Sequence, residues 1–352
     1  MTYASTIEAV SRSSGSPSTP ALEYNPALDG LRGLAALAVV GFHSAFPFMS
    51  GGFLGVDLFF VLSGFLITRL LRAEVAATGR IDVLRFYWRR ALRLWPPLLA
   101  MLVLYACCVP LIADTDWQSD VLLAMFYLTD YSYPFWGEPE LLRHTWSLSV
   151  EEHFYLVWPL AILLTRRIEA AKLAVIFFGL YVAATGWRIF DYWFFADWHW
   201  TYFRFDARLS GLMLGSIAGL IPWKPSSEAI GWAGLALLAM LTATMTLPSW
   251  FQFTNGTIAA EFASASVVLS AVHCRDSLFF RMLAWRPLVA CGLLSYSIYL
   301  VHYPVVRVLR EVMSPAETFT ITAAVSIALA AMIRIWIEKP LRRWRDRSLA
   351  IA

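Results

Sequence analysis

Arg32 and His43 are the side chains whose types and spacing point most directly to chemistry. They are 11 residues apart. This is close to three turns of an α-helix, so they share one helix face and lie about 16 Å apart. An imidazole can take a proton from a hydroxyl group near neutral pH when a partner fixes its tautomer. We therefore predict that His43 acts as a general base, with Glu152, or else Glu151 or Asp57, as that partner.

Other apolar segments also carry ionisable or phenolic side chains in the half of the membrane where His43 is expected. Charged groups inside a bilayer are costly, so they usually face a protein interior and mark a working site. We therefore expect a polar cavity that opens outward, in which Arg208 or Tyr299 stabilises a negatively charged oxygen. The groups expected at this depth are His43, Asp57, Glu151, Glu152, Arg208, Glu261, Tyr299 and His302.

A structural role is the alternative for each of these residues taken singly. His43 or His302 could hydrogen-bond only a backbone carbonyl of a neighbouring helix. Glu261 could belong to a loop, and Tyr296 and Tyr299 could be packing residues or interfacial anchors. The shared depth of the groups, more than any one of them, favours a site.

The stretch FYWRRALRLWPP at residues 86–97 combines arginines with tryptophans immediately before an apolar segment. Arg90 and Arg93, at i and i+3, share a helix face and can clamp phosphates, while the indoles of Trp88 and Trp95 can stack on a nucleotide base. A phosphorylated ligand such as coenzyme A would fit this pattern. The alternative is a basic interfacial helix that holds anionic lipid.

The elements that position these residues follow from composition. Of 352 residues, 59% are hydrophobic and 15% are charged, with a mean hydropathy of +0.60, which is too apolar for a water-soluble domain of this length. We predict an all-α, polytopic transmembrane bundle of about ten spans, because a spanning helix needs about 20 apolar residues. The expected spans are 28–48, 52–71, 96–113, 146–165, 172–190, 206–222, 229–247, 256–273, 287–309 and 318–337. Residues 121–135 are too short and polar to span, and we expect one re-entrant or interfacial helix there.

Arginines collect in alternate connections between the expected spans. The segment after the second span is the most basic, whereas the loops on the opposite side, such as residues 114–140, are acidic or neutral. Positive flanks stay in the cytoplasm, so both termini are expected to be cytosolic. The basic residues of that segment are Arg69, Arg72, Arg80, Arg85, Arg89, Arg90 and Arg93.

The terminal segments and the cysteines narrow the choice further. We expect residues 1–24 to be a disordered cytosolic tail, residues 25–345 one transmembrane domain and residues 346–352 a second cytosolic tail. The four cysteines lie in or beside apolar runs without metal-ligand spacing, which argues against a disulfide framework and a metal site. A net charge of +3 is too weak to indicate nucleic-acid binding.

A series of motifs in this order resembles the acyltransferase-3 family, membrane transacylases that O-acylate bacterial surface polysaccharides, related lipids and some antibiotics. The resemblance covers most of the chain, from about residue 28 to residue 344. The motifs are LDGLRGLAALAVVGFH at 28–43, GGFLGVDLFFVLSGFLI at 51–67, RRALRLWP at 89–96, HTWSLSVEEHFYLVWP at 144–159, DARLSGLMLG at 206–215, LSYSIYLVHYP at 294–304 and EKPLRRW at 338–344.

The resemblance implies a cytosolic acyl-CoA donor, most often acetyl-CoA, as a substrate and not as a tightly bound cofactor. It implies a carbohydrate or glycolipid acceptor at the outer face of a bacterial cytoplasmic (inner) membrane. By the same resemblance His43 would be the catalytic residue, and Arg32, Arg90 and Arg93 would recognise the donor. His43 would act as a general base or would itself be transiently acylated. Further candidates for donor binding are Ser63, Arg69, Arg72 and Arg89.

Two rival functions and several details stay open at this stage. A proton-coupled transporter would also bury carboxylates and histidines, but it predicts inverted repeats, and the LDGLRG opening has no counterpart after the fifth expected span. A lipid-binding scaffold would not explain the buried polar layer. Some members of the family carry a fused extracytoplasmic domain, whereas this sequence ends soon after its tenth expected span. We therefore expect it to complete the transfer itself or to pass the acyl group on.

The acceptor, the acyl chain length and the oligomeric state are not determined by the sequence. An aromatic cluster between the fifth and sixth expected spans could stack on sugar rings or anchor the membrane interface, and the second role is favoured. Its members are Tyr192, Trp193, Phe194, Phe195, Trp198, Trp200, Tyr202 and Phe203.

Overall fold

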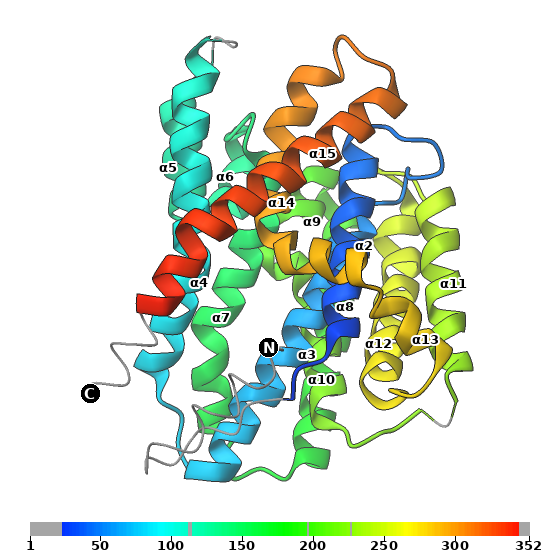
Figure 1. Ribbon diagram of the computed structural model, residues 1–352. Helices are drawn as coiled ribbons and strands as arrows, with labels where there is room; N and C mark the ends of the chain where they lie inside the picture. Colours follow the sequence, from blue (N-terminus) through cyan, green and yellow to red (C-terminus); the bar gives the residue numbers. More distant parts are fainter. Residues whose placement is uncertain (1–22, 112–114, 196, 226, 345–352) are drawn as a thin grey trace.

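The computed structural model describes residues 23–111, 115–195, 197–225 and 227–344, and this part of the chain consists of helices and connections without a strand (Figure 1). The expected tails at 1–24 and 346–352 lie outside the described residues, except for positions 23 and 24. The long helices are α2 (Pro26–His43), α3 (Leu54–Thr78), α4 (Val83–Cys108), α7 (Trp146–Leu164), α8 (Ala170–Phe195), α10 (Phe205–Leu220), α11 (Ala229–Thr244), α12 (Thr257–His273), α14 (Arg286–Leu309) and α15 (Pro315–Ile333).

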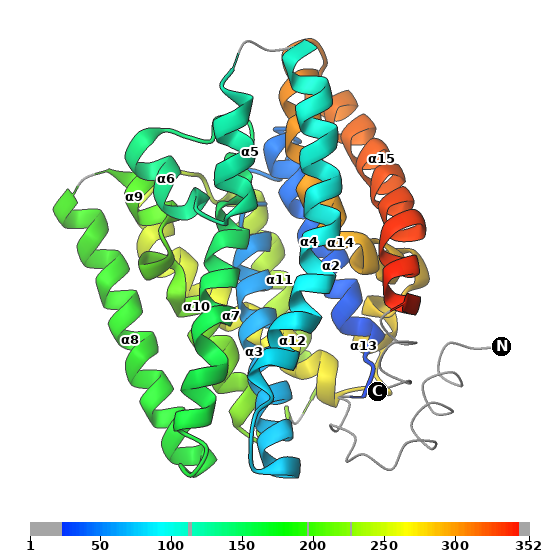
Figure 2. The same cartoon turned by 90° about the vertical axis from the view of Figure 1, so that its left-hand side faces the viewer.

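Short helices connect several of these elements. They are α5 (Trp117–Met125), α6 (Thr129–Trp136), α9 (Trp198–Phe203) and α13 (Leu278–Leu283), with 3₁₀ turns at Val109–Leu111 and Arg143–Thr145. Wide π-type turns occupy Gln252–Gly256, before α12, and Arg334–Glu338, after α15. Figure 2 shows α6 and α9 near one end of the bundle, and the turns that join α3 to α4 and α7 to α8 at the other end.

Helix α3 lies inside the bundle and α15 lies at its edge. The most apolar 18-residue window of α3 is 78% buried, whereas that of Pro315–Trp344 is only 17% buried. Small residues allow the inner helices to approach closely: a Cβ atom on Gly215 of α10 would lie 2.1 Å from the carbonyl oxygen of Val61 on α3. The exposed apolar face of α15 is what a helix in contact with lipid requires.

Each of the ten expected spans contains an α-helix, and six helical segments are long and apolar enough to cross a membrane. The chain is therefore a multi-pass membrane protein, whereas the full count of about ten spans and the cytosolic placement of both termini stay predictions. The other four expected spans are short or carry charges. Helices α10 and α11 have 16 residues each, and α2 and α7, with 18 and 19 residues, carry charged side chains. The six segments are α3, α4, α8, Gln252–His273, α14 and Pro315–Trp344.

Two local expectations are wrong. Residues 121–135 do not form one helix: α5 ends at Met125 and α6 begins at Thr129, with Tyr127 between them at φ 54°. Helix α2 ends at His43 instead of continuing to residue 48, because the chain turns at Ala45, where φ is 53°. A left-handed residue cannot continue a right-handed helix, and these backbone angles cannot be seen in a hydropathy pattern.

Candidate functional site

A cavity of about 590 Å³ lies where the C-terminal end of α2 meets α9, α14 and the start of α15. Its lining combines imidazoles, arginines and tyrosines with a wall of aromatic rings. Among the described residues that line it there is no aspartate or glutamate. The polar side chains include His43, Arg143, His144, His199, Tyr299, Tyr303 and Arg310, and the aromatic wall includes Phe42, Trp146, Trp198, Tyr202 and Phe203.

His43 and His302 form a pair in which the hydrogen-bond pattern fixes both tautomers. Nδ1 of His302 lies 2.6 Å from the carbonyl oxygen of Tyr299, which can only accept, so Nδ1 carries the proton. In the neutral ring, Nε2 of His302 is then an acceptor. It lies 3.0 Å from Nδ1 of His43, which must therefore donate. This leaves Nε2 of His43 with a free lone pair, in a ring that lines the cavity.

The partner of His43 is thus an imidazole, and the predicted carboxylate partner is wrong. His302 is fully buried behind His43, on a helix, α14, that packs along α2. Sequence spacing could not pair the two, because they are 259 positions apart. The predicted Glu152 instead lies beside Arg90, at 3.8 Å.

Tyr299 connects this pair to α7. Its hydroxyl donates to the carbonyl oxygen of His144 at 2.8 Å and accepts from the hydroxyl of Ser147 at 2.6 Å. Its backbone carbonyl orients His302. Tyr299 lines the cavity as expected, but its hydroxyl proton is already engaged, so the geometry favours a positioning role over the predicted stabilisation of an oxyanion.

A second polar cluster lies on α2, α3, α4 and α7, away from the cavity. The hydroxyl of Ser63 donates to Glu151 at 2.6 Å, and the guanidinium of Arg90 lies 3.2 Å from the centre of the Tyr155 ring. Arg93 is within electrostatic range of both Arg32 and Arg90. The predicted residues that this arginine cluster brings together are Arg32, Ser63, Arg90, Arg93, Glu151 and Glu152.

Three further arginines were predicted to bind the donor, namely Arg69, Arg72 and Arg89. Arg69 stacks over Phe65 on α3, 5.2 Å from the ring centre, and is within electrostatic range of Arg275 instead of Arg90. Arg72 is further along α3, and Arg89 is exposed on α4. The contacts of Arg69 thus lie outside the arginine cluster, and donor binding by these three arginines stays a prediction.

Asp57 and Arg208 form an ion pair inside the bundle, with a distance of 2.8 Å between Oδ1 and the guanidinium. Both side chains are at most 3% exposed, and neither lines the cavity. The guanidinium lies beneath the cavity's aromatic wall, 5.1 Å from the ring of Tyr202 and 5.5 Å from that of Trp146. A second pair, Arg188 with Glu261 at 3.3 Å, is equally buried. The polar groups that were expected to share one cavity at one depth in the membrane therefore belong to separate clusters.

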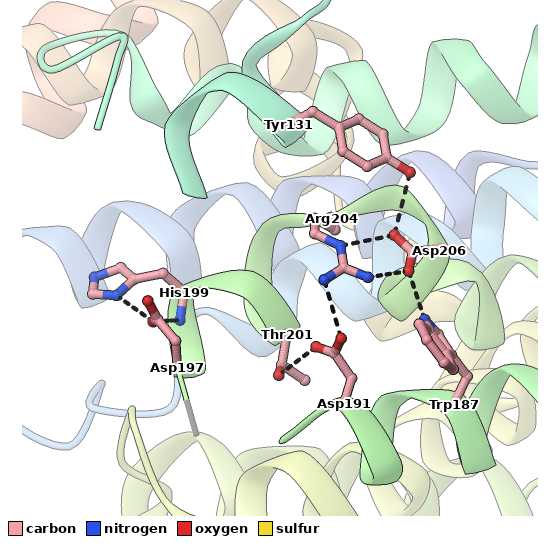
Figure 3. Close-up of polar contacts among 8 residues, drawn as sticks. All are labelled: Tyr131, Trp187, Asp191, Asp197, His199, Thr201, Arg204 and Asp206. Carbon is pink, nitrogen blue, oxygen red and sulfur yellow. Dashed lines mark hydrogen bonds and ion pairs between the residues drawn. The ribbon is translucent and has the colours of Figure 1, made fainter. Parts of the chain in front are cut away.

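Polar contacts around Arg204 hold the short helix α9 in place (Figure 3). Arg204 binds Asp191 of α8 at 3.0 Å and pairs with Asp206 of α10, while Thr201 of α9 donates to Asp191 at 2.8 Å. Tyr131 of α6 donates to Asp206 at 3.2 Å. Burial alone would lower the pKa of Arg204, but the carboxylates of Asp206 and Asp191 raise it, so the arginine stays charged. We call these residues the α9 clamp.

The α9 clamp explains how the aromatic cluster of residues 192–203 is divided. Trp198, Tyr202 and Phe203 line the cavity, whereas Trp193 and Phe194 are 64% and 68% exposed on α8. The two roles considered for the cluster thus correspond to its two parts. The inward rings are in position to contact a ligand, and the outward ones are in position to face lipid.

Several cavity residues escaped sequence analysis. Arg143 directly precedes the motif at 144–159, which begins with His144, and Tyr303 lies within the motif at 294–304. His144 and Tyr303 have stacked rings 5.1 Å apart. Their positions within or beside the family motifs were the available signal. Arg310 lies outside these motifs and carried no such signal.

Residues 25–337 match a family model described as an acyltransferase domain. This chain belongs to the acyltransferase-3 family. The family resemblance read from the motifs is thereby confirmed. The chain is similar to O-acetyltransferase OatA of Staphylococcus aureus strain NCTC 8325, with 33% identity over 91% of this chain and 57% of the relative.

Another relative is the putative O-acetyltransferase SAS0844 of S. aureus strain MSSA476, with 30% identity over 92% of this chain and 58% of the relative. The chain therefore spans just over half the length of these curated relatives. No solved structure matches it significantly. Within the family, the geometry described above belongs to the part that the chain shares with O-acetyltransferases.

Proposed function

We propose that this protein is a membrane O-acyltransferase that moves an acyl group, most simply acetyl, from acyl-CoA to a hydroxyl of a carbohydrate or glycolipid. The observation that carries the proposal is the free lone pair on Nε2 of His43, fixed by His302 in a polar cavity. Family membership and two O-acetyltransferase relatives support the reaction class.

In the proposed mechanism, Nε2 of His43 removes the proton of the acceptor hydroxyl as its oxygen attacks the thioester carbon. The carbon–sulfur bond then breaks, and the leaving thiolate takes the proton back from His43. Hydrogen bonding to neutral His302 stabilises the positive charge that His43 carries between these steps. Transient acylation of His43 itself, followed by transfer to the alcohol, is the alternative sequence of bonds.

The donor is proposed to bind on the other side of the bundle, where Arg32, Arg90 and Arg93 cluster. Guanidinium groups suit the phosphates of coenzyme A, and the acyl arm is proposed to extend along the α2 face that joins Arg32 to His43. Because the arginine-rich end of a membrane protein is expected in the cytoplasm, this arrangement suits a cytosolic donor and an outward acceptor in a bacterial inner membrane.

The decisive experiment measures free thiol released from acetyl-CoA by the detergent-purified protein, together with transfer of labelled acetyl to a crude carbohydrate fraction of the cell envelope. The proposal predicts thiol release that depends on His43. A proton-coupled transporter, the second function considered, would release no thiol. Absence of release with correctly folded protein and envelope carbohydrate present would reject the acyltransferase assignment.

A further inference from the structure

The cavity around His43 has a strongly one-sided charge. Arg143 and Arg310 both line it, and both are within electrostatic range of His43. The guanidinium of Arg143 donates to the hydroxyl of Tyr133 at 2.9 Å and lies 5.4 Å from the ring centre of Tyr303. Among the described residues, no carboxylate lies within ion-pair distance of Arg143, and Arg310 has only its exposed neighbour Glu311, at 4.0 Å.

This charge contrasts with that around the three most deeply buried arginines, which are at most 8% exposed. Arg188, Arg204 and Arg208 each face a carboxylate at 3.3 Å or less. Taking a guanidinium out of water is costly unless a negative group compensates it. A half-buried arginine beside a cavity that the described part of the chain lines without a carboxylate is therefore suited to an anion from outside.

Buried polar atoms around the same cavity also lack partners. Within the described part of the chain, no hydrogen-bond partner faces the hydroxyls of Ser44 and Thr318 or Nδ1 of His144, although all three side chains are at most 2% exposed and line the cavity. Leaving a buried polar group without a hydrogen bond is costly, so such groups mark places for a hydrogen-bonding ligand or water. The hydroxyl groups of a sugar match this set.

We propose that the acceptor is an anionic sugar, whose carboxylate or phosphate is bound between Arg143 and Arg310 while its hydroxyls face His43 and the unpartnered polar groups. This inference rests on the proposed function, because it assigns the acceptor class of the same cavity. Trp198 and Tyr202 provide flat apolar surfaces for the sugar ring. The anionic group positions the sugar, so that one hydroxyl reaches Nε2 of His43.

The experiment measures calorimetric binding to the purified full chain with two pairs of probes. The first pair is tetragalacturonate and its neutral methyl ester, which test a carboxylate. The second pair is maltotetraose 1-phosphate and maltotetraose, which test a phosphate. We expect the charged member of at least one pair to bind about 10-fold more tightly than its neutral partner at low salt, the amount that one or two charge-assisted hydrogen bonds supply.

Arg143→Gln and Arg310→Gln should each remove most of this preference. Arg281→Gln is the matched control, because it removes the same charge from α13, outside the cavity, and it should leave the preference unchanged. Arg310 is exposed at the cavity rim, so Arg310→Gln tests the proposal even if Arg143→Gln fails to fold. Size-exclusion chromatography and thermal unfolding identify folded variants.

The proposal is overturned if neutral and charged probes bind equally, if none of the four binds at millimolar concentration, or if the preference survives both cavity substitutions. Measuring thiol release from acetyl-CoA distinguishes failure of this inference from failure of the proposed function. Thiol release without anion preference rejects only the acceptor class. Anion preference without thiol release leaves a sugar-binding cavity and rejects the transferase reaction.

Discussion

The cavity around His43 and the ion pairs beneath it are both buried and polar, yet they are built differently. Asp57 faces Arg208 and Glu261 faces Arg188, so two negative groups are matched by two positive ones. The cavity instead presents histidines and arginines without a carboxylate among its described lining residues. Internal compensation indicates a structural role, whereas uncompensated polarity indicates a ligand. Depth in the membrane does not distinguish the two.

Replacing His43 by Ala is the strongest test of this contrast. Acetyl transfer should fall by about 1,000-fold or more, because a positioned general base contributes about 10²–10⁴ in rate. Stability should change little, since His43 makes one hydrogen bond and lies at the end of α2. The measurement is thiol release with thermal unfolding in parallel. Transfer at the wild-type rate would remove His43 from the chemistry.

Replacing Asp57 by Asn tests the compensated region. It leaves Arg208 buried without its partner, and the stability should fall by about 3–5 kcal/mol. The measurement is thermal unfolding in detergent. A paired Asp57→Asn and Arg208→Met variant serves as the control and should regain most of the loss. A variant that keeps wild-type stability but loses transfer would instead place Asp57 in the reaction and erase the contrast.

Substitutions of His302 test whether this residue fixes the tautomer of His43. His302→Ala removes the acceptor that fixes the His43 tautomer, so kcat should fall by about 10- to 100-fold, less than the loss of the base itself, with little change in KM. In His302→Gln the amide oxygen can still accept from Nδ1 of His43, and part of the activity should return. Equal losses in both variants would show that His302 only fills space.

Arg204→Gln should have the smallest effect. It loosens the α9 clamp by removing the contacts with Asp191 and Asp206. Part of this arrangement is solvent-screened, since the side chain of Asp206 is 34% exposed. We expect KM for the sugar acceptor to rise a few-fold through movement of Trp198 and Tyr202, while the KM for acetyl-CoA stays constant. A rise in the donor KM alone would contradict this role of the clamp.

Local patterns in the sequence predicted much of the fold and part of the site. Helices were found at all ten expected positions because a run of apolar residues is sufficient to indicate each one. His43 and Tyr299 were placed correctly beside a polar cavity. The partner of His43 was missed, because helix depth gives a side chain's level but not the direction in which it points around the bundle.

The sequence by itself determined that the chain is a membrane protein, that its elements are helices, and which family it belongs to. These properties follow from composition, periodicity and motifs, which are local. Only the tertiary structure decided that His302 binds His43, that Asp57 belongs to an internal ion pair, and that Arg143 and Arg310 meet at one cavity. Such contacts join residues up to 259 positions apart, and they depend on the rotation of each helix against its neighbours.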